Sequence, residues 1–72
     1  MLSNRIAICR AEKRWTQQKL ADEVGVSRQT IVAIEKNKYN PSLILAFKIS
    51  HAFNKPLTSV FQYEEETNDG NT

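Results

Sequence analysis

Few residues in this chain of 72 have the types and spacing that enzyme chemistry requires. Cys9 is the single cysteine and His51 the single histidine, so neither an internal disulfide nor a His/Cys metal site is predicted. Serine, threonine and acidic residues are plentiful, but they form no recognisable grouping of nucleophile, base and orienting residue. Gly25 and Gly70 are the only glycines, which excludes a glycine-rich phosphate loop. The sequence therefore predicts no enzyme, no metal and no cofactor.

Cys9 itself fits two interpretations. It lies on an apolar helical face and is predicted to be a small core residue. Arg10 and Lys13 are close in sequence, so a redox-sensing thiol stays open as the alternative, which requires exposure and a basic surrounding.

The charges are distributed unevenly. Residues 1–60 contain all ten Lys and Arg and four acidic residues, a net charge of ten minus four or +6, while the other four acids lie in the last nine residues. A basic body fits an anionic partner, although a soluble surface with a solvated tail explains the same pattern.

No stretch approaches the ~18 apolar residues of a membrane span, and no signal peptide is recognisable. We expect a cytoplasmic protein without a membrane partner.

Apolar residues recur at helical spacing along most of the chain. Helices are predicted over residues 4–13, 17–24, 28–36 and 43–53, followed by one short turn over residues 57–61. Thr16, Ser27 and Ser42 are suitable N-caps, and Gly25 is a suitable helix end. Trp15 is predicted to be a core residue. These elements predict an all-α fold of about five helices in one domain over residues 1–63, with an acidic tail, 64–72, that we expect to be disordered.

Two of these helices would meet at a sharp junction over residues 24–27. Ala21 is small where the helices cross, and Gly25 permits the turn. Val26, Ile31 and Ile34 would hold the second helix against the first. These offsets are typical of a helix-turn-helix, whereas an ordinary helical hairpin, the alternative, does not require them.

The pattern Gln17-x3-Ala21-x3-Gly25-Val26-Ser27-x3-Ile31-x2-Ile34-Glu35 resembles the Xre family of lambda-repressor and Cro-like helix-turn-helix proteins. The resemblance covers residues 4–61 and is strongest to short stand-alone regulators of that family. It implies a compact five-helix, lambda-repressor-like domain that binds a palindromic operator in double-stranded DNA as a homodimer. Nothing in the sequence resolves a separate effector-binding domain, so no small-molecule effector is expected. It also implies a small two-stranded sheet between residues 1–3 and 61–63, for which frayed termini are the alternative.

The resemblance assigns side chains to the DNA. In the family the helix after the turn lies in the major groove with its N-terminal side chains on base edges. The implied base contacts are Arg28, Gln29, Thr30, Val32 and Ala33, and the implied backbone contacts are Gln17, Ser27, Lys38, Tyr39 and Asn40. Arg28 suits guanine and Gln29 suits adenine, because each can form two hydrogen bonds to its base. Gln17 can also brace the recognition helix, and residues 38–40 can instead be a plain solvated loop.

Arg10 and Glu35 match a family ion pair between the first and third helices, so both are assigned a structural role.

The C-terminal third carries more apolar residues than one helix face can bury. Leu43, Ala46, Ile49 and Phe53 form one stripe, and other apolar residues lie outside it. Because exposed apolar surface marks interfaces, and the family dimerises through this end, we expect a dimer interface formed by Ile44, Phe47, Leu57, Val60, Phe61 and Tyr63.

Two functions of different classes fit these observations. The first is a dimeric transcriptional regulator, expected to be a repressor that blocks polymerase by occupying its operator. The second is a protein-interaction module of the same fold, such as an antitoxin or an adaptor, with the acidic tail serving a partner. The combination of Arg28, Gln29 and Lys38 at the contact positions favours DNA, because a pure interaction module does not need all three.

Overall fold

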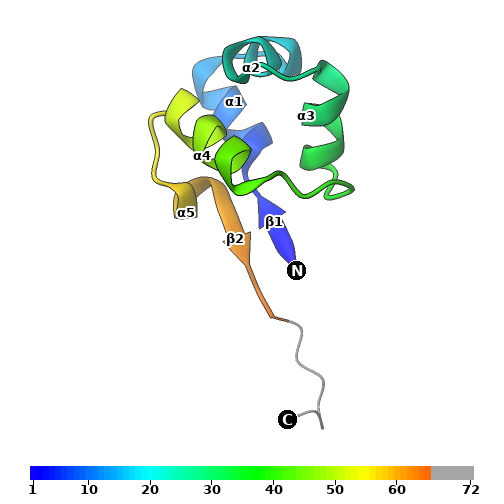
Figure 1. Cartoon of the computed structure of the whole chain (residues 1–72). Helices are drawn as coiled ribbons and strands as arrows, with labels where there is room; N and C mark the ends of the chain where they lie inside the picture. Colours follow the sequence, from blue (N-terminus) through cyan, green and yellow to red (C-terminus); the bar gives the residue numbers. More distant parts are fainter. Residues whose placement is uncertain (66–72) are drawn as a thin grey trace, which may run out of the picture.

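The computed structural model describes residues 1–65. Within them the order of elements is β1 (Leu2–Asn4), α1 (Ile6–Lys13), α2 (Gln17–Val24), α3 (Arg28–Glu35), α4 (Leu43–Ala52), α5 (Leu57–Val60) and β2 (Phe61–Tyr63). The helices form a bundle, and the two strands lie side by side at one end of it (Figure 1). The predicted five-helix fold with a small terminal sheet is confirmed. No helix in residues 1–65 is long and apolar enough to cross a bilayer.

The sheet joins the two ends of the described chain. The strands are antiparallel and pair Leu2 with Tyr63, Ser3 with Gln62 and Asn4 with Phe61. The first strand thus lies one residue later than predicted. Pairing continues past the strands, because the Glu64 N–H donates to the Met1 carbonyl at 3.0 Å and the Met1 ammonium donates to the Glu64 carbonyl. The first residue of the predicted tail is therefore held by the fold, and residues 66–72 lie outside the described part.

All three predicted N-caps are present and fix where α2, α3 and α4 begin. Each hydroxyl accepts a hydrogen bond from the backbone N–H three residues on: Thr16 from Lys19 (3.0 Å), Ser27 from Thr30 (3.2 Å) and Ser42 from Leu45 (3.1 Å). Such a bond satisfies one of the N–H groups that a helix leaves unpaired at its start.

The end of α3 sets the direction of the loop that follows. Asn37 adopts the left-handed conformation (φ 60°), which asparagine tolerates better than most residues. Its N–H donates to the Ile34 carbonyl at 3.0 Å, and the Lys38 N–H donates to the Ala33 carbonyl at 2.9 Å. This is the Schellman arrangement, which closes a helix and turns the chain away from its axis. Lys38 and the residues after it are thereby held at the end of α3.

The core lies between all five helices and the start of β2. Its largest fully buried apolar side chains are Ile6, Leu20, Ile31, Ile34, Ile49 and Val60. Trp15 is half-buried against this core and packs on Phe53, with ring centroids 5.7 Å apart. Trp15 thus packs on the core as predicted, but it lies at the edge of the core and is only partly buried.

The structure corrects the predicted burial in the C-terminal third. The helical spacing predicts Leu43 on the buried stripe of α4, but Leu43 is 66% exposed, and Leu45 packs on the core instead. The sequence predicts Val60 and Phe61 in a dimer interface, but within a single copy of the chain they are only 0% and 7% exposed. Pairing of β2 with β1 brings this segment back over the core, so Val60 and Phe61 are covered within one copy of the chain.

Candidate nucleic-acid interface

The turn between α2 and α3 depends on the backbone of Gly25. Its φ of 80° is the left-handed conformation, and its N–H donates to the Ala21 carbonyl at 2.8 Å. The Val26 N–H reaches the same carbonyl at 3.1 Å. A Cβ added at Gly25 would meet no atom within 4 Å, so the conformation, and not a lack of space, requires glycine. The predicted helix-turn-helix geometry is present.

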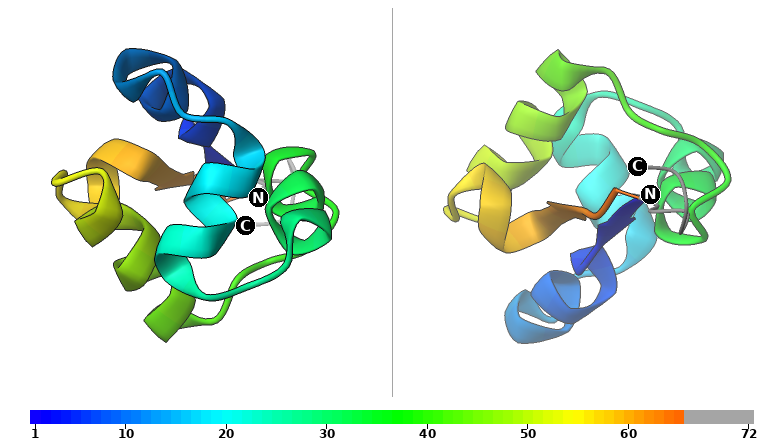
Figure 2. Two further views of the ribbon diagram at one scale, coloured as in Figure 1. Left: turned by 90° about the horizontal axis from the view of Figure 1, so that it is seen from above. Right: turned by 90° about the horizontal axis from the view of Figure 1, so that it is seen from below.

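The two faces of α3 differ as a recognition helix requires. Ile31 and Ile34 are buried against the bundle, and α3 lies along one side of the molecule (Figure 2). Arg28 and Gln29 are exposed at the N-terminal end of the helix. Thr30, Val32 and Ala33 are half-buried, so these three present less surface to a ligand.

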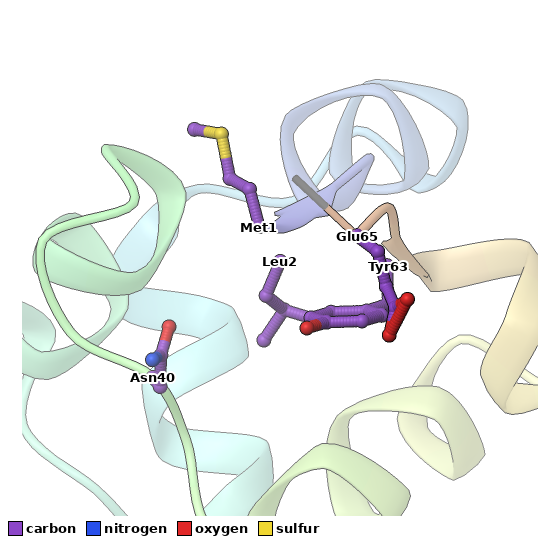
Figure 3. Close-up of a pocket in the computed structure, with 5 residues that line it drawn as sticks. All are labelled: Met1, Leu2, Asn40, Tyr63 and Glu65. Carbon is purple, nitrogen blue, oxygen red and sulfur yellow. The ribbon is translucent and has the colours of Figure 1, made fainter. Parts of the chain in front are cut away.

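The residues predicted to contact the DNA backbone differ in whether their side chains are already hydrogen-bonded within the protein. Ser27 is exposed, but its hydroxyl already caps α3 and lies 3.0 Å from the Thr30 hydroxyl. Lys38, Tyr39 and Asn40 are exposed on the loop that follows α3. Asn40 also lines a surface hollow of about 530 Å³ with Met1, Leu2, Tyr63 and Glu65, between the sheet and this loop (Figure 3).

The predicted ion pair between Arg10 and Glu35 is present and joins α1 to α3. Arg10 Nε donates to Glu35 Oε2 at 2.7 Å, and Arg10 Nη2 donates to Glu35 Oε1 at 3.1 Å. The remaining amino group, Nη1, donates to the Trp15 carbonyl at 2.9 Å. The side chains are only 19% and 11% exposed, so this paired contact is partly shielded from water.

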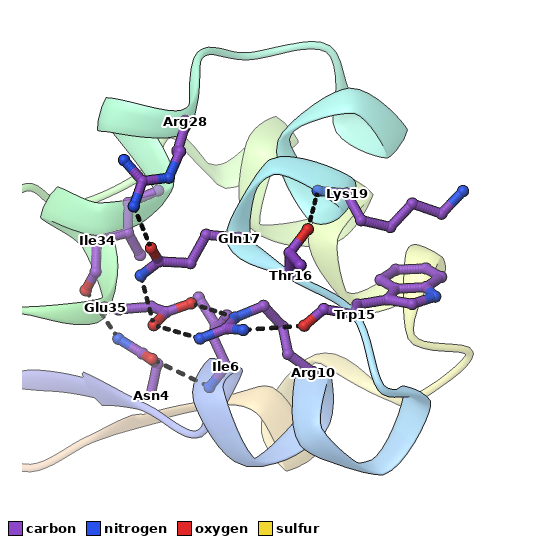
Figure 4. A network of polar contacts seen from close by, with 10 residues as sticks. All are labelled: Asn4, Ile6, Arg10, Trp15, Thr16, Gln17, Lys19, Arg28, Ile34 and Glu35. Carbon is purple, nitrogen blue, oxygen red and sulfur yellow. Dashed lines mark hydrogen bonds and ion pairs between the residues drawn. The ribbon is translucent and has the colours of Figure 1, made fainter.

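Gln17 lies between this ion pair and the exposed end of α3. Its Nε2 donates to Glu35 Oε1 at 3.2 Å, and its Oε1 accepts from Arg28 Nη2 at 3.3 Å (Figure 4). The suggested bracing of the recognition helix by Gln17 is thus present. Both ends of the amide are therefore engaged, and the NH2 group keeps one further N–H donor beside the backbone N–H groups at the start of α2.

Asn4 is a positioning residue that the sequence interpretation missed. Its Oδ1 accepts from the Ile6 N–H at 3.1 Å and so helps start α1. Its Nδ2 donates to the Ile34 carbonyl at 3.0 Å and to Asn37 Oδ1 at 3.3 Å, both at the end of α3. An asparagine two residues before an apolar helix is a recognisable cap signal, but its link to α3 spans thirty residues and has no local signature.

Cys9 is buried, at 3% exposure. Burial raises the pKa of its thiol, an effect that Glu12 reinforces and that the positive charges of Lys55 and Arg5 oppose. A raised pKa keeps the thiol protonated through neutral pH, and the thiolate is the reactive form. The core interpretation of Cys9 is therefore confirmed by its burial.

We expect Cys9 to react slowly with a thiol-specific alkylating reagent near neutral pH in the folded protein and rapidly in urea. The folded-state pKa of Cys9 lies above the ordinary value of 9.0, so folding favours the protonated thiol. The contribution of this thiol to folding stability is therefore present below pH 9.0 and is lost as pH rises through the raised pKa. Mass spectrometry of the labelled chain measures the rate. Equal rates with and without urea would show that the thiol is accessible.

The fold and this surface together define a helix-turn-helix DNA-binding protein. Residues 6–60 match the helix-turn-helix family, and the chain belongs to it. Membership of this family of DNA-binding regulators also agrees with the prediction that the chain is not an enzyme, and with the resemblance to Xre-like proteins. Among residues 1–65 no three His, Cys, Asp or Glu side chains gather in a way that would hold a metal ion.

Individual relatives agree with this assignment. The chain is 49% identical over 65 residues to an uncharacterised HTH-type transcriptional regulator of Methanocaldococcus jannaschii, covering 90% of this chain and 98% of the relative. It is 35% identical over 57 residues to the antitoxin HipB of Escherichia coli, covering 79% of this chain and 61% of that longer protein. A crystal structure of a candidate DNA-binding protein from Bacteroides fragilis superposes with a TM-score of 0.78 at 34% identity, covering 86% of this chain and all of the other.

Proposed function

We propose that this protein is a sequence-specific transcriptional repressor that binds a palindromic operator as a homodimer, with α3 in the major groove. The observation that carries the proposal is the exposed pair Arg28 and Gln29 at the N-terminal end of a helix whose other face is buried. These are the side chains that match guanine and adenine edges by paired hydrogen bonds. Occupying an operator would block polymerase without any catalytic chemistry.

Base recognition is tested by replacing each reader separately. Arg28→Ala and Gln29→Ala are each expected to relax the preference for one base pair by ~1–3 kcal/mol, because each removes one bidentate contact. Wild-type protein first selects a consensus from a pool of random duplexes, and binding is then measured on every single-base variant of it.

Gln18→Ala is the matched control for Gln29→Ala. Gln18 is exposed on α2 and donates to Asp22 Oδ1 at 2.8 Å, outside the proposed contact set. Its replacement should leave base preference unchanged. Equal losses on consensus and random DNA for Arg28→Ala and Gln29→Ala would exclude both residues as readers of sequence.

Phosphate contact by the loop after α3 is tested through its salt dependence. Lys38→Ala is expected to weaken binding to all sequences alike and to lower the slope of log affinity against log salt by about 1, since one fewer phosphate is neutralised. Fluorescence anisotropy across a salt series measures this slope. Lys48→Ala, an exposed lysine on α4, is the control, and an unchanged slope for Lys38→Ala would exclude the contact.

The proposed dimer uses the exposed apolar residues of α4. Ile44 is 71% exposed, Phe47 is 43% exposed, and Leu43 lies beside them one helical turn before Phe47. We refer to Leu43, Ile44 and Phe47 as the α4 patch. Tyr63 on β2 is also exposed, whereas Leu57 is half-buried and Val60 and Phe61 are buried. Of the interface residues predicted from the sequence, the proposed interface therefore retains Ile44, Phe47 and Tyr63. It adds Leu43, which is also exposed.

The similarity to HipB favours a second function, a protein-interaction module such as an antitoxin. In that case the α4 patch would bind a different protein. The two functions predict different states of the purified chain, because only the first requires the chain to associate with itself. The presence of Arg28, Gln29 and Lys38 on the exposed surface supports the first.

A further inference from the structure

The two ends of α3 are connected by hydrogen bonds through one side chain of α2. Glu35, the last residue of the helix, accepts from Gln17 Nε2 at 3.2 Å. Gln17 Oε1 in turn accepts from Nη2 of Arg28, the first residue of the helix, at 3.3 Å. Figure 4 shows the three side chains in line, with Arg10 on the far side of Glu35. The chain of contacts runs from a shielded ion pair to an exposed guanidinium.

The polarity of this chain is determined by the groups at its two ends, of which Glu35 is the one that Arg10 holds in place. A carboxylate only accepts hydrogen bonds, so the Gln17 amide must turn its NH2 group toward Glu35. Its carbonyl oxygen then faces Arg28, whose guanidinium only donates. The opposite rotation of the amide would place two acceptors against each other at Glu35 and two donors against each other at Arg28. Arg10 keeps the carboxylate in position through contacts of 2.7 and 3.1 Å.

We propose that Glu35 is a positioning residue for base recognition, which fixes the direction of the Gln17 amide and thereby orients Arg28 before DNA binds. This inference rests on the proposed function in one respect, that Arg28 contacts bases. The Gln17 carbonyl occupies one N–H of Nη2 and leaves the other donors of Arg28 for a base edge. A guanidinium that is already oriented loses less conformational freedom on binding than a free one.

Glu35→Gln tests the inference, because it keeps the size of the side chain but replaces a group that only accepts with an amide that can also donate toward Gln17. The direction of the Gln17 amide then depends on the exposed Arg28 guanidinium. We expect the ratio of affinities for the selected consensus and a shuffled duplex to fall about tenfold, the effect of losing one well-oriented base contact. Arg10→Lys is the comparison variant. It weakens the same ion pair but leaves a carboxylate opposite Gln17, so stability should fall while the affinity ratio is kept.

A double-mutant cycle separates positioning from a general structural effect. If Glu35 acts through Arg28, Glu35→Gln should cost nothing further in the affinity ratio once Arg28→Ala is present. The same tenfold loss in both backgrounds, or an equal loss of the ratio in Arg10→Lys, would overturn the inference and assign Glu35 to stability alone.

A measurement without DNA keeps the inference testable if the proposed function fails. In ¹⁵N-labelled wild-type protein, the Gln17 side-chain amide should show the shift and slowed hydrogen exchange of an NH2 group bonded to a carboxylate, and rotation of the Arg28 guanidinium should be slowed. Both signatures should be lost in Glu35→Gln and retained in Arg10→Lys. Wild-type protein without sequence preference would reject the proposed function, while unchanged spectra in Glu35→Gln would reject this inference.

Discussion

Ile31→Ala is expected to destabilise the folded protein by ~3–4 kcal/mol and to remove DNA binding with it. Ile31 is 0% exposed and is the residue of α3 that enters the core nearest the proposed base contacts. Truncating a buried isoleucine loses its transfer free energy and leaves a cavity, which together cost ~2–5 kcal/mol. A folded chain of 72 residues has a total stability of only about 4–11 kcal/mol. One substitution thus removes a large part of what holds α3 in place.

Ile8→Ala is the matched control, because Ile8 on α1 is 59% exposed. The same truncation there should change stability by no more than ~0.5 kcal/mol. Urea denaturation followed by circular dichroism gives both values under one set of conditions. If the two variants lost equal stability, Ile31 would not occupy the core and the assignment of the inner and outer faces of α3 would be wrong.

The helix starts and the turn were predictable from the sequence because their causes are local. Thr16, Ser27 and Ser42 each bond to an N–H three residues away, so the cap and its partner lie within one window of sequence. Gly25 is the only glycine among residues 1–65, and it stands where a left-handed residue ends a helix. Local rules of this kind place the helix-turn-helix to within a residue.

Burial in the C-terminal third was less predictable. The helix α4 is apolar on most of its sides, so helical spacing does not indicate which face is inward. The prediction of Leu43 as the buried residue is therefore wrong, and Leu45 packs on the core. Burial of Val60 and Phe61 depends on the pairing of β2 with residues some sixty positions earlier. A pairing of that range has no periodic signal in the segment itself.

In the candidate site, too, features with local causes were predictable from the sequence and contacts between distant residues were not. The exposure of Arg28 and Gln29 follows from the spacing of Ile31 and Ile34, which fixes the opposite face of α3. The bonds from Gln17 to Glu35 and Arg28 do not follow from spacing, since they need three side chains from two helices to meet. The spacing of apolar residues thus predicted which positions of α3 are exposed, while the structure showed that the Gln17 amide is already engaged.

Glu replacement in the α4 patch is expected to convert a dimer to a monomer and to lower operator affinity by about 100-fold or more. Ile44→Glu and Phe47→Glu place a charge where two copies would bury apolar surface, which strongly disfavours association. A dimer presents two recognition helices about 34 Å apart, one DNA turn, so the second half-site is bound at high effective concentration. A monomer loses this second contact but keeps each of its own base contacts.

Sedimentation velocity and binding to a full and a half operator measure these effects together. Ile8→Glu is the matched control, since it adds the same charge at an exposed isoleucine on α1, outside the α4 patch. The patch variants should lose affinity for the full site while their affinity for the half-site stays close to wild type, because the surface of α3 is untouched. Patch variants that remain dimers would place the interface elsewhere on the molecule. A wild-type chain that is monomeric at high concentration would end the dimer proposal and favour a different protein as the partner of the α4 patch.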